Sequence, residues 1–170
     1  MKSFVLKKQQ FIQRPLKEIF SFFERPENLA LITPSHLGFQ IITPSPITMK
    51  KGAVIDYTIK VMGLRVGWQT VITDYQPGKL FVDEQAKGPY RHWRHTHTFS
   101  ELQNGTLMTD EIQYAVPLGV LGDLVHAVFV RSQLENIFDY RSRVIQELFA
   151  SHDAPTRKQL TVSDRMEVQL

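Results

Sequence analysis

The sequence contains no cysteine, and this absence excludes several kinds of site at once. A chain without thiols cannot form a disulfide framework, hold an iron–sulfur cluster through thiolates, or use a cysteine nucleophile. The sequence also lacks an apolar run of roughly 18 residues, so we expect no integral membrane association. The apolar stretch near the N-terminus is too short for a signal peptide, which favours a cytoplasmic protein.

A strong charge of one sign is missing as well. The formal net charge is only +3, and the basic residues are scattered along the chain instead of forming the stripe that a phosphate backbone attracts. We therefore expect no nucleic-acid partner. A chain of 170 residues with 42% hydrophobic residues can bury a core without a metal or a cofactor, and we predict neither. The composition predicts one domain over residues 1–150 and a polar tail over 151–170.

Turn residues divide the first two thirds of the chain into short extended segments. We predict an edge strand over 3–11 and two short helices after it, the first beginning at Pro15 and ending before Pro26. Turns rich in glycine and proline then separate further strands, which hairpins join into an antiparallel meander. These strands are expected at 53–61, 66–75, 80–85, 90–100 and 106–114.

The last element is predicted to be one long helix. Apolar residues recur at helical spacing from Leu121 to Phe149, and Asp123 is the expected N-cap. Such a helix would be roughly 40 Å long, enough to cross the sheet. The expected fold class is α+β, with a curved antiparallel sheet of about six or seven strands wrapped around this helix. We expect a solvated face of the helix at Arg131, Glu135, Asp139, Arg141 and Arg143.

Two strands that flank Asn104-Gly105 indicate where an interior polar cluster lies. Side chains alternate along a strand, and the aromatic face is the one expected to be buried. On the first strand this face carries Trp93, His95, His97 and Phe99. With the turn at the hairpin tip, the returning strand adds Met108, Asp110, Ile112 and Tyr114 to the same face.

Interior polar groups need partners, because burying one without a hydrogen bond costs about 1–3 kcal/mol. One interpretation is structural: Asp110 accepts a hydrogen bond from His95 or His97 and fixes the tautomer. A second interpretation makes the same groups the polar end of a pocket with apolar walls. The two interpretations are compatible, and the sequence leaves both open.

At these residues the sequence resembles the SRPBCC or START-like superfamily of helix-grip proteins. It is most similar to the polyketide cyclase/dehydrase-like branch, which occurs alone or joined to an epimerase-like protein often labelled a cell-division inhibitor. The resemblance covers about residues 1–150 and implies a helix-grip fold with an internal cavity between the C-terminal helix and the sheet. The matching residues are Gly88-Pro89, Trp93-x-His95-x-His97-x-Phe99, Asp110-Glu111, Pro117-Leu118-Gly119-x-Leu121-Gly122 and Ile137-Phe138-x-Tyr140-Arg141.

The resemblance also extends to Phe81-x-Asp83-x-Gln85 and implies that Asp83 faces the cavity. Alternation alone does not decide this point, because it equally accepts Leu80, Val82 and Glu84 as the buried face.

The leading functional hypothesis is binding of a small hydrophobic molecule, whether aromatic, polyketide-like, quinone or lipid-like, in this cavity. An epimerase-like protein or a second copy of the chain is a further expected partner, the former implied by the resemblance. The residues expected to line the site are Trp93, His95, His97, Phe99, Met108, Asp110, Tyr114, Asp83, Val128 and Phe138.

Two alternatives use the same cluster. A cyclase or dehydratase would employ His95, His97 and Asp110 as acid–base residues near neutral pH. A metal site would use the two histidines of His95-x-His97 with Asp110 as a third ligand. The second alternative is the least favoured, because no fourth ligand is evident.

Overall fold

The structure is a computed structural model that describes residues 2–61, 63–117 and 129–150. The predicted N-cap at Asp123, the expected wall residue Val128 and the predicted tail over 151–170 lie outside these ranges. No helix among the described residues is long and apolar enough to cross a membrane.

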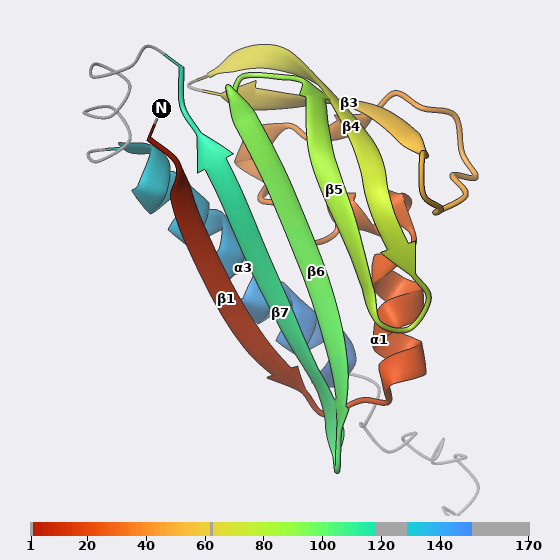
Figure 1. The fold of residues 1–170 in the computed structure, drawn as a ribbon. Coiled ribbons are helices and arrows are strands. Elements are labelled where there is room, and N and C mark those ends of the chain that lie inside the picture. The colour runs from red at the N-terminus through yellow and green to blue at the C-terminus, as the bar shows by residue number, and fades with distance from the viewer. Residues whose placement is uncertain (1, 62, 118–128, 151–170) are drawn as a thin grey trace, which may run out of the picture.

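One antiparallel sheet of seven strands forms the body of the protein (Figure 1). Its spatial order is β1-β7-β6-β5-β4-β3-β2, so most neighbouring strands are hairpin partners, as predicted. The first strand, β1, pairs with the last strand, β7. The expected edge position of the first strand is confirmed. The strands are β1 (Phe4–Ile12), β2 (Gln40–Ile41), β3 (Val54–Val61), β4 (Leu64–Gln76), β5 (Leu80–Lys87), β6 (His92–Leu102) and β7 (Gly105–Ala115).

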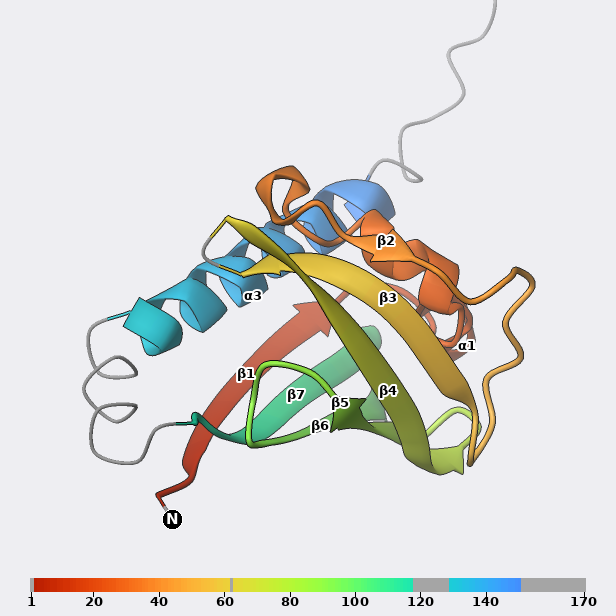
Figure 2. The same cartoon turned by 90° about the horizontal axis from the view of Figure 1, so that it is seen from above.

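The helices lie on the concave side of this sheet. Helix α1 (Leu16–Phe23) begins directly after Pro15, whose fixed φ suits the start of a helix, and turns its apolar face to the sheet. Two short 3₁₀ turns follow, η1 (Pro26–Ala30) and η2 (Ser35–Leu37). Helix α3 (Arg131–Ala150) crosses the opening of the curved sheet (Figure 2). The predicted α+β helix-grip architecture is confirmed.

Polar contacts join helix α3 to the edge strand β1 and to Arg14, which follows this strand. The side chain of Gln10 donates to the carbonyl oxygen of Ser142 at 2.8 Å, and Arg14 donates to the carbonyl oxygen of Phe149 at 2.7 Å. The second contact satisfies a carbonyl in the last turn of the helix, which has no partner inside the helix.

The buried core divides into two apolar clusters. One lies under α1 and includes Phe20, Phe99 and Met108, and the other lies under the first half of α3 and includes Trp93, Tyr114 and Phe138. Both clusters draw residues from β6 and β7, at opposite ends of these strands. The middle of the two strands therefore lies between them.

The β6–β7 hairpin turns where the Asn104-Gly105 pattern predicted, since Leu102 pairs with Gly105. Gly105 also lies against the end of β1. A Cβ atom at this position would collide with the carbonyl oxygen of Ile12 and would lie 2.9 Å from Cα of Gln13. The glycine is required here by close backbone approach.

We expect Gly105→Ala to lower the free energy of unfolding by about 1–3 kcal/mol, because backbone atoms must move to admit the methyl group. Urea unfolding measures this change. The matched control is Gly67→Ala on β4, where a Cβ atom would meet nothing within 4 Å. Equal stability of the two variants would contradict the close approach of β1 to Gly105.

Candidate functional site

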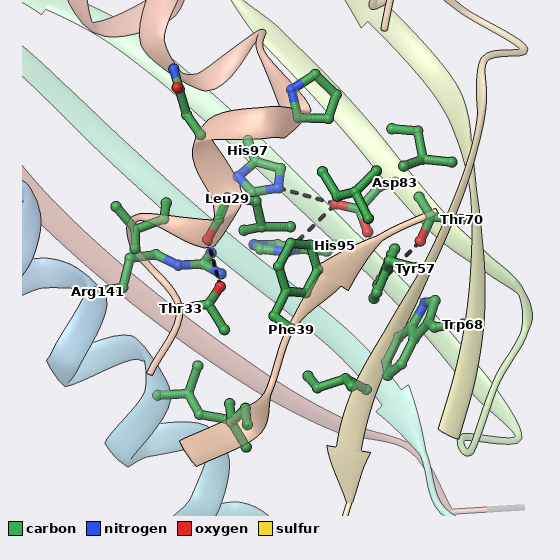
Figure 3. A pocket seen from close by; sticks show the side chains of 18 of the residues that line it. Leu29, Thr33, Phe39, Tyr57, Trp68, Thr70, Asp83, His95, His97 and Arg141 are labelled. Atoms are coloured by element: carbon green, nitrogen blue, oxygen red, sulfur yellow. Dashed lines mark hydrogen bonds and ion pairs between the residues drawn. The ribbon is translucent and has the colours of Figure 1, made fainter. Parts of the chain in front are cut away.

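A cavity of about 190 Å³ lies between α3, the η1 and η2 turns and the concave face of the sheet. It is many times larger than the roughly 10–15 Å³ that one water requires. Most of its walls are apolar, with contributions from Leu29, Phe39, Ile55, Trp68, Trp93 and Phe138. Its polar groups include Tyr57, Thr70, Asp83, His95, His97 and Arg141 (Figure 3).

Strand β6 places both histidines at the inner end of this cavity. Burial alternates strictly from Trp93 to Phe99, so the odd-numbered side chains all face inward. In the ladder, His97 pairs with Asp110 on β7 and His95 pairs with Asp83 on β5. The predicted face of β6 and β7 is confirmed, and β5 supplies a second carboxylate.

Each imidazole lies between the two carboxylates. Nε2–H of His95 donates to Oδ1 of Asp110 at 2.9 Å, and Nε2–H of His97 donates to Oδ2 of Asp83 at 3.1 Å. The Nδ1 atom of His97 lies 2.8 Å from Oδ1 of Asp110, but this approach is too poorly aligned for a hydrogen bond, so we interpret it as an ionic contact. The two imidazole rings lie with their centroids 3.7 Å apart and their planes tilted by 37°.

The pKa shifts follow from this crossed arrangement. Burial alone would raise the pKa of Asp110, but the contacts with His95 and His97 outweigh burial and hold this pKa far below its ordinary value. The pKa of Asp83 is also lowered, because the two histidines likewise outweigh its burial.

The two histidines shift in opposite directions. Burial lowers the pKa of both, but the two carboxylates outweigh burial at His97 and raise its pKa. At His95 burial and the neighbouring charge of His97 prevail, so its pKa falls. Of the two imidazoles, His97 therefore holds its proton more strongly than His95 does.

Arg141 differs from the sequence-based expectation. We expected it on the solvated face of the helix, but its side chain is only 8% exposed and lines the cavity. The spacing explains this, since Arg141 follows Phe138 by three residues and precedes Ile145 by four, and both neighbours are buried. The other four charged residues of that predicted face are exposed or half-buried, as expected.

The remaining predicted site residues fall into two groups. Trp93, Asp83 and Phe138 line the cavity together with the histidines. Asp110 lies beneath the imidazoles and is reached through them. The residues that the structure places in the apolar clusters, and that are not among those lining the cavity, are Phe99, Met108 and Tyr114.

Several lining residues were not found from the sequence. Tyr57 on β3 and Trp68 on β4 are paired in the ladder and stack with ring centroids 5.7 Å apart. Both positions carried a signal, namely aromatic side chains on neighbouring predicted strands. Their place in the cavity depends on the curvature of the sheet, which brings β3 and β4 round toward α3 (Figure 2).

The cluster also offers a group of metal donors, though a different one from the group predicted. Donor atoms of Asp83, His95 and His97 lie within 4.8 Å of one another, whereas the sequence suggested Asp110 as the third ligand. Asp110 contacts the histidines from the other side, as a carboxylate behind ligating histidines does. His97 of this group also donates a hydrogen bond to Asp83, so the geometry equally serves proton transfer.

We expect Asp110→Asn to lower the free energy of unfolding at pH 7 by about 3 kcal/mol, because it removes the buried charge that both imidazoles contact. A carboxyl whose pKa is lowered by folding stabilises the fold above its unfolded pKa of about 3.9 and loses that contribution as pH falls. The difference between wild type and variant should therefore shrink below about pH 4. Urea unfolding from pH 7 to pH 3 measures both effects.

The control for this variant is Asp139→Asn, since Asp139 is an exposed carboxylate of α3 paired with Lys8. Its effect should be at most about 1 kcal/mol. If Asp139→Asn lowered the free energy of unfolding as much as Asp110→Asn, the buried cluster would stabilise the fold no more than a surface ion pair does.

Comparisons with known proteins agree with this architecture. A family model described as "Polyketide cyclase / dehydrase and lipid transport" matches residues 12–138. A search of the curated proteins found no match.

Solved structures with the same fold come from distant sequences. A crystal structure of a Thermus thermophilus protein has a TM-score of 0.65 at 12% identity, covering 88% of this chain and 99% of that one. The major latex-like protein 151 of Panax ginseng has a TM-score of 0.64 at 14% identity, covering 86% and 97%. The di-domain ARO/CYC StfQ from the steffimycin biosynthetic pathway has a TM-score of 0.66 at 12% identity, covering 88% of this chain and 51% of that one.

Proposed function

The chain belongs to the polyketide cyclase/dehydrase and lipid transport family, and from that premise we propose that it binds a small hydrophobic molecule in the cavity beneath α3. The observation that carries this proposal is the cavity itself, which combines mostly apolar walls with a few buried polar side chains, among them His95, His97 and Arg141. That combination is typical of small-molecule sites.

The walls favour a ligand with flat, apolar surfaces. Trp68 stacks on Tyr57, and Trp93 meets Trp68 edge to face at a centroid distance of 5.3 Å. Aromatic side chains in these arrangements present both ring faces and ring edges to a guest. A ring system or an unsaturated chain could therefore pack against the aromatic wall formed by Tyr57, Trp68 and Trp93.

Burial alone does not supply a useful affinity. Removing about 200 Å² of apolar ligand surface from water contributes about 5 kcal/mol, before the losses of association. A dissociation constant of about 1 μM corresponds to about 8 kcal/mol. The polar groups at the inner end must therefore contribute, and His95, His97 and Asp83 would orient a carbonyl or hydroxyl group of the ligand.

Filling the cavity should abolish binding. We expect Leu29→Trp to weaken binding of the neutral dye N-phenyl-1-naphthylamine at least tenfold, because the indole would occupy the space that the dye needs. The matched control is Leu31→Trp, which adds the same indole at a position that is 55% exposed and outside the cavity. Displacement titrations with both variants, and native mass spectrometry for co-purified molecules, provide the measurements. Unchanged affinity in the Leu29 variant would exclude this cavity as the site.

The crossed carboxylate–imidazole cluster favours a second candidate, acid–base catalysis on the bound molecule. The two imidazoles could supply one proton to the bound molecule and accept another from it, as a cyclisation or dehydration requires. Both groups line the cavity and would meet the substrate directly.

If the chain is such an enzyme, His97→Asn should lower the turnover of a poly-β-ketone substrate at least about 100-fold while changing its affinity by less than tenfold. His92→Asn is the control, because His92 belongs to the same strand and points to the other face. Product analysis by liquid chromatography gives the rates. Equal turnover in all three proteins would exclude the catalytic role and leave the binding role intact.

A further inference from the structure

The side chain of Arg141 is a buried cation that forms no hydrogen bond or ion pair with the part of the chain that the structure describes. Its Nε is fully enclosed. The group lies over the ring of Phe138, 4.6 Å from the ring centroid. A contact with an aromatic face offsets part of the charge but accepts no N–H bond in good geometry.

Such an arrangement is costly without a further partner. Arginine stays protonated in proteins and presents five N–H donors in a rigid fork. Leaving a buried charge unpaired costs several kcal/mol, and a removed hydrogen-bond partner costs more when the group is ionised. The fold keeps this cation inside the cavity nonetheless, although the spacing of α3 would accept a leucine at the same position.

The carboxylates of the cluster do not fill this role. Asp83 and Asp110 act on Arg141 through space and oppose the lowering of its pKa by burial. One oxygen of each carboxylate contacts the histidines at 2.8–3.1 Å, and neither carboxylate forms an ion pair with the guanidinium. The donors of Arg141 are therefore available inside the cavity, across from Asp83 and the histidines (Figure 3).

The missing partner has a definite chemistry. An anion with two oxygens in one plane matches the guanidinium fork and forms the strongest hydrogen bonds available to it. A doubly charged group such as a phosphate monoester would meet more repulsion from Asp83 and Asp110 than a singly charged one. A carboxylate satisfies both conditions.

We propose that the ligand of this cavity carries a carboxylate, which Arg141 binds, while the apolar body of the ligand lies against Tyr57, Trp68 and Trp93. This inference rests on the proposed binding function and names the class of ligand. The ligand is thus an apolar acid, not a neutral lipid or a hydrocarbon.

Two matched pairs of probes test the head group alone. They are 2-naphthoate with methyl 2-naphthoate, and decanoate with decanol, each titrated calorimetrically at pH 7, where the acids are ionised. We expect wild-type protein to bind the acid of at least one pair at least tenfold more tightly than its neutral partner. Arg141→Gln should lower the affinity for that acid at least tenfold and change the affinity for the neutral partner by less than threefold.

The control is Arg143→Gln, since Arg143 is an exposed arginine of the same helix and does not line this cavity. It should keep the preference of the wild type. Arg141→Lys retains the positive charge but not the planar guanidinium. We expect its preference for the acid over the neutral partner to lie between those of the wild type and Arg141→Gln. Thermal unfolding of each variant confirms that the fold is intact, and the comparison of acid with neutral partner in wild-type protein needs no variant at all.

The two proposals fail in different ways. If wild type binds the acids and the neutral partners equally well, the carboxylate inference is overturned and hydrophobic binding stands. If none of the probes binds, the proposed function fails and the inference fails with it. An acid preference that survives Arg141→Gln would show that another group holds the anion, which also overturns the inference.

Discussion

The two imidazoles of β6 lie between a carboxylate of β5 and a carboxylate of β7, with aromatic side chains on either side of them along β6. His95, His97 and Asp110 are buried and Asp83 is half-buried, and such groups cannot be placed there singly, because each would lose water without replacement. Placed together, they satisfy one another through charge-assisted contacts. The register of three neighbouring strands is therefore coupled, since a one-residue slip of any of them would turn a charged group outward and leave its partners buried alone.

This polar centre also explains why the core is divided. The aromatic cluster under α1 and the aromatic cluster under α3 meet β6 on either side of His95 and His97. The helices cannot close tightly over charged groups, so the space above the cluster remains open and becomes the cavity. The two histidines that couple the three strands therefore also line the cavity.

Much of this arrangement follows from sequence patterns. The alternation on β6 and β7 is strict, and the Asn104-Gly105 turn sets their register, so the inward face of both strands could be predicted. The short strand β2 could not, because two residues carry no periodicity. The face of β5 was ambiguous for a physical reason: Phe81 and Val82 are both buried, where the pairing of β4 with β5 shifts register between Ile72 and Asp74.

Arg141 illustrates a different limit. Its position in the helical stripe was visible in the spacing, but a charged residue at a buried position contradicts the usual partition of charge to the surface. Only the curvature of the sheet and the course of α3 reveal that the stripe faces a cavity instead of a packed core. Residues that break the usual pattern of burial are concentrated at functional sites.

The cavity has a consequence for the lifetime of the protein. Folded domains are stable by only about 5–15 kcal/mol, and a hollow interior forgoes contacts that a filled one would make. A guest present at about one hundred times its dissociation constant would add roughly 2.7 kcal/mol to that margin. Under the proposed function, molecules with a bound guest would resist unfolding and degradation longer than empty ones, so cellular abundance would follow the supply of the guest.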